Sequence, residues 1–555
     1  MSKSRIKLLS LGFLLGFSLL VLAGCDGGGK DVAVDTGTEA EFVGAATCGE
    51  CHESNFNTWL DTPHAVAYSN LPSSSQNDPV CLECHNTTST LEGVQCEACH
   101  GPGGLHFGLG PIGLSYQDTV CQPCHESNSA ISASHKEIYS QWEVSGHADE
   151  LAPAWLEFSD EAPPPGRHLS TYPIPMSNSS DGNFRCFQCH NGIGSLSYIE
   201  NTILTPAAIT VEENATAECT TCHDPHQETA TKTNALGDVT TTKHVRLPEA
   251  LSFNTSLESV NRVFKFLDES DIPQTIGNSI MCVLCHQGRS SGLVLNTTKF
   301  GLAADDSGRR FENDHYLAAG AILWGRNGYE YTNRLYTRDF AHNELADGNC
   351  IGCHMNNANT GTEGGHTWKM VSDDGQENVA ACNVVGCHGG VAKPVADFRT
   401  FTQSNLDYDG NGFVDGVAEE IGGFDLDANG APLDGLLGAL KTALEDEGFL
   451  YNANRYPYFF KADGSSTTPS DWTNENLAAA FNLNMVVKTV KQFSPLPGGG
   501  FKGGTNIHNP PYTIQVLVDS LESLGDATQV QLDNRPVGTD PARNYGANQL
   551  VLPLP

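Results

Sequence analysis

The sequence predicts a mostly α-helical fold with extensive loops and little β-structure, divided into a cysteine-rich region and a cysteine-free helical region. Of the 19 cysteines, 18 form nine pairs within residues 48–387, and a histidine follows the second cysteine of every pair. Residues 396–555 contain no cysteine. In that region apolar residues recur with a helical period at 433–444 and 514–524. These observations predict short helices tied by the cysteine motifs, followed by a region with longer helices.

Each cysteine pair with its histidine matches the attachment signature of c-type haem. The two thiols bond to the haem vinyl groups, and the adjacent histidine lies under the ring as the proximal iron ligand. Eight motifs have two residues between the cysteines, whereas the ninth has four, and together they predict nine haems c. The predicted thioether residues are Cys48, Cys51, Cys81, Cys84, Cys96, Cys99, Cys121, Cys124, Cys186, Cys189, Cys219, Cys222, Cys282, Cys285, Cys350, Cys353, Cys382 and Cys387. The predicted proximal ligands are His52, His85, His100, His125, His190, His223, His286, His354 and His388.

Disulfides and zinc sites are the alternative uses of paired cysteines. An exported protein could hold these cysteines as disulfides, but a disulfide does not require a histidine after each pair. Zinc sites also use such pairs, yet a histidine in every motif would then have no explanation. The histidines therefore favour haem attachment.

The spacing of the motifs predicts closely packed haems. Residues 48–388 provide about 38 residues for each haem, too few to enclose every macrocycle in its own core. Only 15 residues separate Cys81 from Cys96, which indicates one close pair. We therefore expect a stacked haem chain that replaces a conventional core.

The remaining histidines are the candidates for the distal side of each iron. Eleven remain after the nine proximal ligands, so the supply suffices for two histidines at every iron. Six methionines, including Met1, could serve only a minority of sites. His135 and His168 have the weakest local context. The candidate distal ligands are His64, His106, His147, His226, His244, His315, His342, His366 and His508.

An acidic loop in the cysteine-free region has the spacing of an EF-hand calcium loop over nine positions. Ala418 occupies the twelfth position, where a bidentate glutamate is expected. Structural Ca²⁺ and an acidic turn without an ion are the two interpretations. We expect this region to form a lid over the last haems, with His508 reaching back as a ligand. The candidate calcium ligands are Asp407, Asp409, Asn411 and Asp415.

The N-terminus predicts export and lipid attachment. Lys3, Arg5 and Lys7 precede an apolar run at 8–23, which is too short and wrongly flanked for a transmembrane helix. The run leads into Leu-Ala-Gly-Cys25, similar to the lipoprotein cleavage site at which the cysteine carries the lipid. An ordinary signal peptide with a chance cysteine is the alternative.

The predicted organisation has five parts, and the proline run 163–165 marks the boundary between the two haem modules. The parts are a lipoprotein signal peptide at 1–24, a lipidated flexible tether at 25–41, a four-haem module at 42–165, a five-haem module at 166–395 and the helical region at 396–555.

Several segments are similar to known haem proteins. Residues 93–103, GVQCEACHGPG, and the Cys48 motif with its downstream Trp59 and Pro-His64-Ala resemble the cytochrome c554 family. The segments CHQGR at 285–289, HYLAA at 315–319 and 353–367 resemble multihaem lipoprotein cytochromes of metal-reducing bacteria such as Geobacter and Desulfuromonas. The ninth motif is similar to four-spaced sites of the cytochrome c3 family. The resemblance covers 42–395 and implies low-potential haems with two histidine ligands, stacked in a chain for respiratory electron transfer to or beyond the cell envelope.

The charge and the haem ligands limit the function. A net charge of −36 repels phosphate backbones and argues against a nucleic-acid partner. We expect a lipid-anchored protein of the cell envelope, in the outer membrane, facing the periplasm or outward, or outside the cell. Its expected partners are other envelope redox proteins or an extracellular electron acceptor, and a homo-oligomer is open.

Electron transport is the leading interpretation, because two strong ligands at every iron leave no open position for a substrate. A multihaem reductase is one alternative, but no Cys-x-x-Cys-Lys motif of the kind such enzymes often use occurs here. A cytochrome filament, with a histidine of one copy binding haem in the next, is the other, and a lipid anchor weakly opposes it.

Overall fold

The computed structural model describes fourteen stretches of the chain. They are 41–106, 118–126, 137–156, 189–199, 216–233, 239–248, 274–292, 299–314, 319–344, 349–356, 364–380, 382–383, 406–490 and 505–538, with the single residues 295 and 388 added and 289, 339, 373 and 424 left out. All of them lie in one compact unit, Glu39–Pro555. The signal peptide, the tether and Cys25 fall outside the described residues and stay predictions.

Short helices carry most of the cysteine motifs. In an α-helix, residues three and four positions apart share one face, so the helical turn places both thiols and the following histidine together. These helices are α1 (Ala45–Gly49), α3 (Pro79–His85), α4 (Cys96–His100), α6 (Gln122–His125), α12 (Cys219–Cys222), α13 (Ile280–His286) and α16 (Asn349–His354). The prediction of a mostly helical fold is confirmed.

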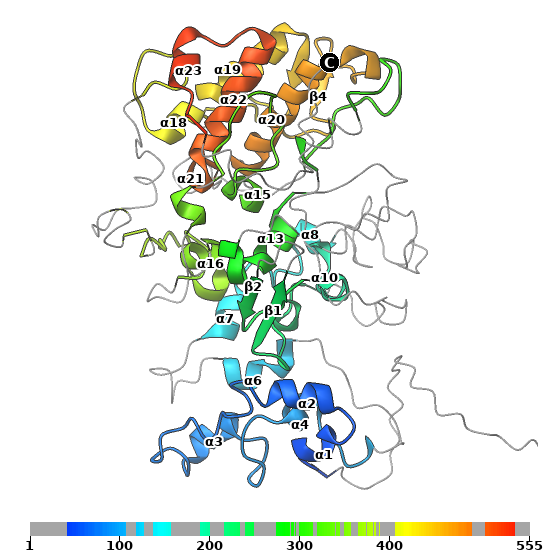
Figure 1. Ribbon diagram of the computed structural model, residues 1–555, viewed down its shortest axis with the longest axis vertical. Coiled ribbons are helices and arrows are strands. Elements are labelled where there is room, and N and C mark those ends of the chain that lie inside the picture. Colours follow the sequence, from blue (N-terminus) through cyan, green and yellow to red (C-terminus); the bar gives the residue numbers. More distant parts are fainter. Residues whose placement is uncertain are drawn as a thin grey trace, which may run out of the picture. The chain divides into compact units, whose positions relative to one another are not determined.

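Further short elements connect the motif helices (Figure 1). The α-helices are α2 (Glu53–Trp59), α7 (Ile138–Glu143), α8 (Pro153–Leu156), α10 (Gly192–Ile199) and α15 (Ala319–Leu323). The 3₁₀ helices are η1 (Asp118–Val120), η5 (Gln274–Ser279), η6 (Ala341–Asn343), η7 (Gly365–Thr367) and η8 (Pro469–Asp471).

β-structure is sparse in the described part of the chain. β1 (Thr229–Thr233) pairs antiparallel with β2 (Val239–Lys243), with Thr229 opposite Lys243. β3 (Phe449–Tyr451) pairs antiparallel with β4 (Phe459–Lys461). Two such two-stranded sheets fit the expectation of little β-structure.

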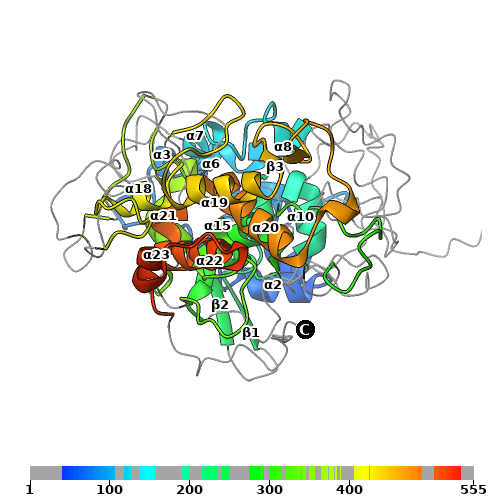
Figure 2. The ribbon, with the colours of Figure 1, turned by 90° about the horizontal axis from the view of Figure 1, so that it is seen from above.

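The C-terminal part contains the longest helices. They are α18 (Val417–Ile421), α19 (Gly435–Asp446), α20 (Asn474–Val490), α21 (Thr505–His508), α22 (Pro510–Leu524) and α23 (Gln529–Asn534). Figures 1 and 2 show α19, α20 and α22 side by side. The two predicted helical segments correspond to α19 and α22, and α22 ends where Gly525 adopts φ +82°.

Two apolar clusters stabilise these parts by removing side chains from water. The larger one joins α19, α20 and α22 through Leu440, Phe481 and Leu517. It also includes Leu295, Ile322, Tyr329 and Tyr336, which precede the predicted boundary at 395. The smaller one surrounds α13, with Ile280 and Val283 fully buried. Within the described residues, no helix has the length and apolar character to cross a membrane.

Candidate haem sites

Among the described residues, seven histidine pairs face each other with their ring centroids 6.0–6.4 Å apart. Each pair joins one predicted proximal histidine to one predicted distal candidate. The pairs are His52 with His106, His125 with His64, His100 with His226, His223 with His366, His286 with His147, His354 with His508 and His388 with His342.

This separation fits an iron between two imidazoles. Imidazole nitrogen lies about 2 Å from a bound first-row metal, and the ring centroid lies about 1.1 Å beyond, so two opposed rings have centroids about 6.2 Å apart. Direct stacking of two rings would bring the centroids closer. The donor set also fits, since histidine is a common axial ligand of haem iron.

Main-chain carbonyls orient several of these rings. Nδ1 of His354 donates to Trp368 O at 3.0 Å, and Nδ1 of His342 donates to Ile507 O at 2.6 Å. Nδ1 of His85 and of His190 donate in the same way to carbonyls at 2.8 and 3.0 Å. Such a bond fixes the tautomer and leaves the Nε2 lone pair for a metal.

Burial keeps the central rings neutral. Burial lowers the pKa of His147 to about 4, and the nearby His286 adds to the shift. Burial lowers the pKa of His286 to about 4, and the nearby His354 adds to that shift. Burial lowers the pKa of His508 to about 3. A neutral imidazole is the form that binds iron.

Thiols of different motifs lie close to one another among the described residues. The neighbouring cysteine side chains are Cys48 with Cys96, Cys84 with Cys124, Cys121 with Cys219, Cys189 with Cys285, and Cys282 with Cys350. Burial raises the pKa of the Cys99 thiol, and the nearby Cys121 adds to the shift. Burial raises the pKa of Cys222 to about 12, and the nearby Cys285 adds to that shift. We number the motifs 1 to 9 in chain order, from the motif that begins at Cys48 to the one that ends at His388. These contacts link motif 1 with 3, motif 3 with 4, motif 2 with 4, motif 4 with 6, motif 6 with 7, motif 5 with 7 and motif 7 with 8.

Contacts outside the thiol pairs support these links. Cys84 Sγ donates to Pro123 O at 3.8 Å, and Cys189 Sγ donates to Leu284 O at 3.8 Å. Asp118 N donates to a Glu218 carboxylate oxygen at 2.9 Å, beside motifs 4 and 6. These motifs therefore contact one another through main-chain groups as well as through their cysteine side chains.

His244, another predicted distal ligand, contacts a carboxylate. The ring of His244 is half exposed, and its Nδ1 lies 3.0 Å from a Glu228 carboxylate oxygen. The backbone of His244 has φ +65°, and its carbonyl accepts from Nδ1 of His223. His244 as a distal ligand stays a prediction, since the contact at Nδ1 leaves Nε2 for an iron, and its main-chain carbonyl supports the site of His223.

Some predicted residues cannot be placed. His315, Cys186 and Cys387 lie outside the described residues, as do the weaker candidates His135 and His168. The second ligands opposite His85 and His190 therefore stay predictions. Proximity in the sequence does not predict the pairing: His226, three residues after the ligand of motif 6, faces His100 of motif 3.

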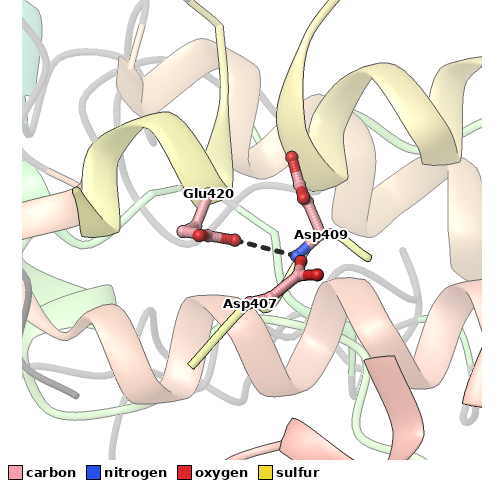
Figure 3. A group of neighbouring side chains, drawn as sticks. All are labelled: Asp407, Asp409 and Glu420. Atoms are coloured by element: carbon pink, nitrogen blue, oxygen red, sulfur yellow. Dashed lines mark hydrogen bonds between the residues drawn. The ribbon is translucent and has the colours of Figure 1, made fainter. Parts of the chain in front are cut away.

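The acidic loop brings together three carboxylates (Figure 3). One oxygen each of Asp407, Asp409 and Glu420 lies within 4.8 Å of the others. Glu420, which the sequence did not single out as a ligand, is buried and accepts from the N–H groups of Tyr408, Asp409 and Asp415. Desolvation raises the pKa of Asp409 to about 6, and the nearby carboxylates add to the shift. Of the other predicted ligands, Asn411 donates from Nδ2 to a carboxylate oxygen of Asp409 at 3.0 Å. Asp415 donates from its main-chain N–H to Glu420.

Comparisons with known proteins agree with the haem sites. The family described as cytochrome c554 and c-prime matches residues 47–101, which hold the first three motifs. The C-type polyheme cytochrome OmcB of Geobacter sulfurreducens is 28% identical over 284 residues, covering 45% of this chain and 32% of that protein. OmcC of the same organism is 27% identical over 284 residues, covering 45% and 30%. Cytochrome c-554 of Nitrosomonas europaea is 30% identical over 104 residues, covering 14% and 43%.

No solved structure matches this chain. The motifs, the opposed histidines and these likenesses define a multihaem c-type cytochrome. It is similar to the polyhaem cytochromes of Geobacter, and the match spans about a third of their length.

Proposed function

We propose that this protein is a nonahaem c-type cytochrome that carries electrons along a chain of haems, each with two histidine ligands, in the cell envelope. It would act in anaerobic respiration or extracellular electron transfer. Its redox partners are other envelope cytochromes or an extracellular acceptor. The proposal rests above all on the series of contacts between the attachment motifs.

That series makes a continuous route. Each thiol marks the edge of a porphyrin, so neighbouring thiols bring two porphyrin edges together. The links give the order 1–3–4–6–7–8, with haem 2 beside haem 4 and haem 5 beside haem 7. Ile507 O, which accepts from His342 at 2.6 Å, is adjacent to His508 and extends the order from haem 8 to haem 9. Neighbouring edges favour electron transfer from one haem to the next.

The residues of the protein would position the haems and supply the axial ligands of their irons. Bound haem iron provides the one-electron redox chemistry. At the seven described pairs, the opposed histidines would occupy both faces of the haem and exclude substrate, which favours electron transfer over a reductase. Carbonyl groups that accept from Nδ1 hold the imidazoles in orientation.

Several finer features belong to the same proposal. Cys25 carries lipid after removal of residues 1–24, and this anchors the protein in the envelope at the outer membrane. The four-haem part ends at 165, the five-haem part ends at 395, and residues 396–555 bind no haem covalently. The cluster of Asp407, Asp409 and Glu420 holds structural Ca²⁺, because hard carboxylate oxygens suit that ion.

The mass and the spin state of the purified holoprotein test the proposal. We expect a mass gain of nine haems and an oxidised spectrum that is entirely low-spin. In His226→Ala, haem 3 loses its second ligand, so one high-spin haem of the nine should appear. The matched control is Val239→Ala, at an exposed position of β2, and it should keep every haem low-spin. A mass without porphyrin, or a high-spin signal in the unmodified protein, would contradict the proposal.

A further inference from the structure

Trp368 touches three of the candidate haem sites. Its indole lies 4.4 Å from the His147 ring at 89°, and 5.5 Å from the His366 ring at 69°, measured between ring centroids. Its carbonyl accepts from Nδ1 of His354 at 3.0 Å. No motif in the sequence points to this residue.

The three histidines belong to three different sites. His147 faces His286 at motif 7, and His366 faces His223 at motif 6. The third, His354, is the proximal candidate of motif 8. Trp368 therefore lies where sites 6, 7 and 8 meet.

The turn that carries Trp368 is firmly built. Gly364 and Gly365 have φ +66° and +51°, and a Cβ at Gly364 would lie 2.1 Å from Asn356 O. His366 N donates to the Gln141 side chain of α7 at 3.0 Å, and Gly364 N donates to Lys369 O at 2.9 Å. These contacts fix the turn against α7.

Trp368 itself has a left-handed backbone conformation, with φ +52°. This conformation is rare for a bulky side chain and persists only where the surroundings determine it. It directs the indole towards two imidazoles while the carbonyl reaches a third. A helical or extended residue in this position would not present both groups in these directions.

We propose that Trp368 is a positioning residue that fixes the ring orientation of the axial histidines at haems 6 and 7. In the proposed order, haem 7 is the haem that haem 5 also neighbours. The inference rests on the proposed function. The indole packs edge-on against His147 and His366 and restricts rotation of both rings. Ring orientation in turn sets the electronic state of a ferric low-spin haem.

The test compares Trp368→Leu and Trp368→Phe with the wild-type holoprotein by electron paramagnetic resonance. The gz values of low-spin ferric haem report the relative orientation of the axial rings. In Trp368→Leu we expect the signals of two haems to shift while the other seven stay unchanged, at a full complement of nine haems by mass. Trp368→Phe keeps an aromatic edge, so its shifts should be smaller and fall on the same signals.

Trp59→Leu is the matched control. Trp59 is a buried tryptophan whose indole donates to Val94 O at 3.2 Å, in the part of the chain that holds the first three motifs. Its substitution should leave the signals of haems 6 and 7 in place. Wild-type spectra for both Trp368 variants, or identical shifts in Trp59→Leu, would overturn the inference.

A failure of Trp368→Leu to assemble leaves Trp368→Phe to decide: a partial shift of the two signals supports the inference and an unchanged spectrum overturns it. Failure of the proposed function is distinguishable, because it would appear in the wild type as missing haem mass or a high-spin signal.

Discussion

At the scale of single residues, Glu97 shows how one carboxylate ties two haem sites together. It lies between the cysteines of motif 3 and is almost fully buried. Its oxygens accept from the N–H groups of Val43 and Gly44 at 2.8 Å and of Gly103 at 2.7 Å. Val43 and Gly44 lead into motif 1, and Gly103 leads to His106, which faces His52 of the same motif.

Substitution of Glu97 by alanine should loosen both segments. The three N–H groups would lose their acceptor, and a buried unsatisfied donor costs about 1–3 kcal/mol, so we expect an overall loss of about 3 kcal/mol. Hydrogen exchange should accelerate at Val43, Gly44 and Gly103. Glu97→Gln keeps one acceptor oxygen and should have an intermediate effect. Unchanged exchange at these amides in Glu97→Ala would contradict this role.

At the scale of elements, the sequence predicted the helices that have one apolar face. Apolar periodicity at 433–444 and 514–524 indicated α19 and α22, because each presents one stripe to the core. It did not indicate α20, which is buried along most of its length and has little periodic contrast. Asn482 and Asn484 lie in the middle of α20 and are fully buried, a feature that no propensity predicts.

The side-chain amide of Asn482 hydrogen-bonds both main-chain groups of Tyr329. Its Oδ1 accepts from Tyr329 N at 2.7 Å, and its Nδ2 donates to Tyr329 O at 3.0 Å and to Ser520 Oγ at 3.0 Å. The side chain thereby fixes α20 to the 319–338 segment and to α22. Both polar atoms of the buried amide therefore have hydrogen-bond partners.

Asn482→Ala should therefore destabilise the C-terminal core. The two main-chain groups of Tyr329 would be buried without partners, which we expect to lower the free energy of unfolding by about 3 kcal/mol. Asn454→Ala, at an exposed position, is the matched control and should change it by less than about 0.5 kcal/mol. Chemical denaturation followed by tryptophan fluorescence measures both. Equal effects in the two variants would show that the amide of Asn482 has no special role.

At the scale of the whole molecule, the ligand pairs join distant parts of the chain. His226 faces His100, and His366 faces His223. The cysteine motifs could be predicted residue by residue, since thioether chemistry demands local spacing. The pairs could not, because a second ligand needs only to reach the open face of an iron, and no sequence distance constrains it.

The last such pair connects the C-terminal helices to the haem chain. His508, at the end of α21, faces His354 of motif 8 with ring centroids 6.4 Å apart. The next residue, Asn509, caps α22 by accepting from Tyr512 N at 3.1 Å and donates to Thr337 O at 3.2 Å. A ligand bond at His508 would therefore hold α22 and its core against the haem region.

His508→Ala should both open one iron and loosen this connection. We expect a single high-spin ferric haem among the nine, with haem 8 affected because its second ligand is gone. Added imidazole should bind in the space left by the side chain and restore the low-spin spectrum without repairing the link to α22. Proteolysis within the C-terminal helices should therefore stay faster than in the wild type even after imidazole is added. A fully low-spin spectrum in His508→Ala would show that another residue serves haem 8. Normal protease resistance would show that the C-terminal core docks independently of this ligand.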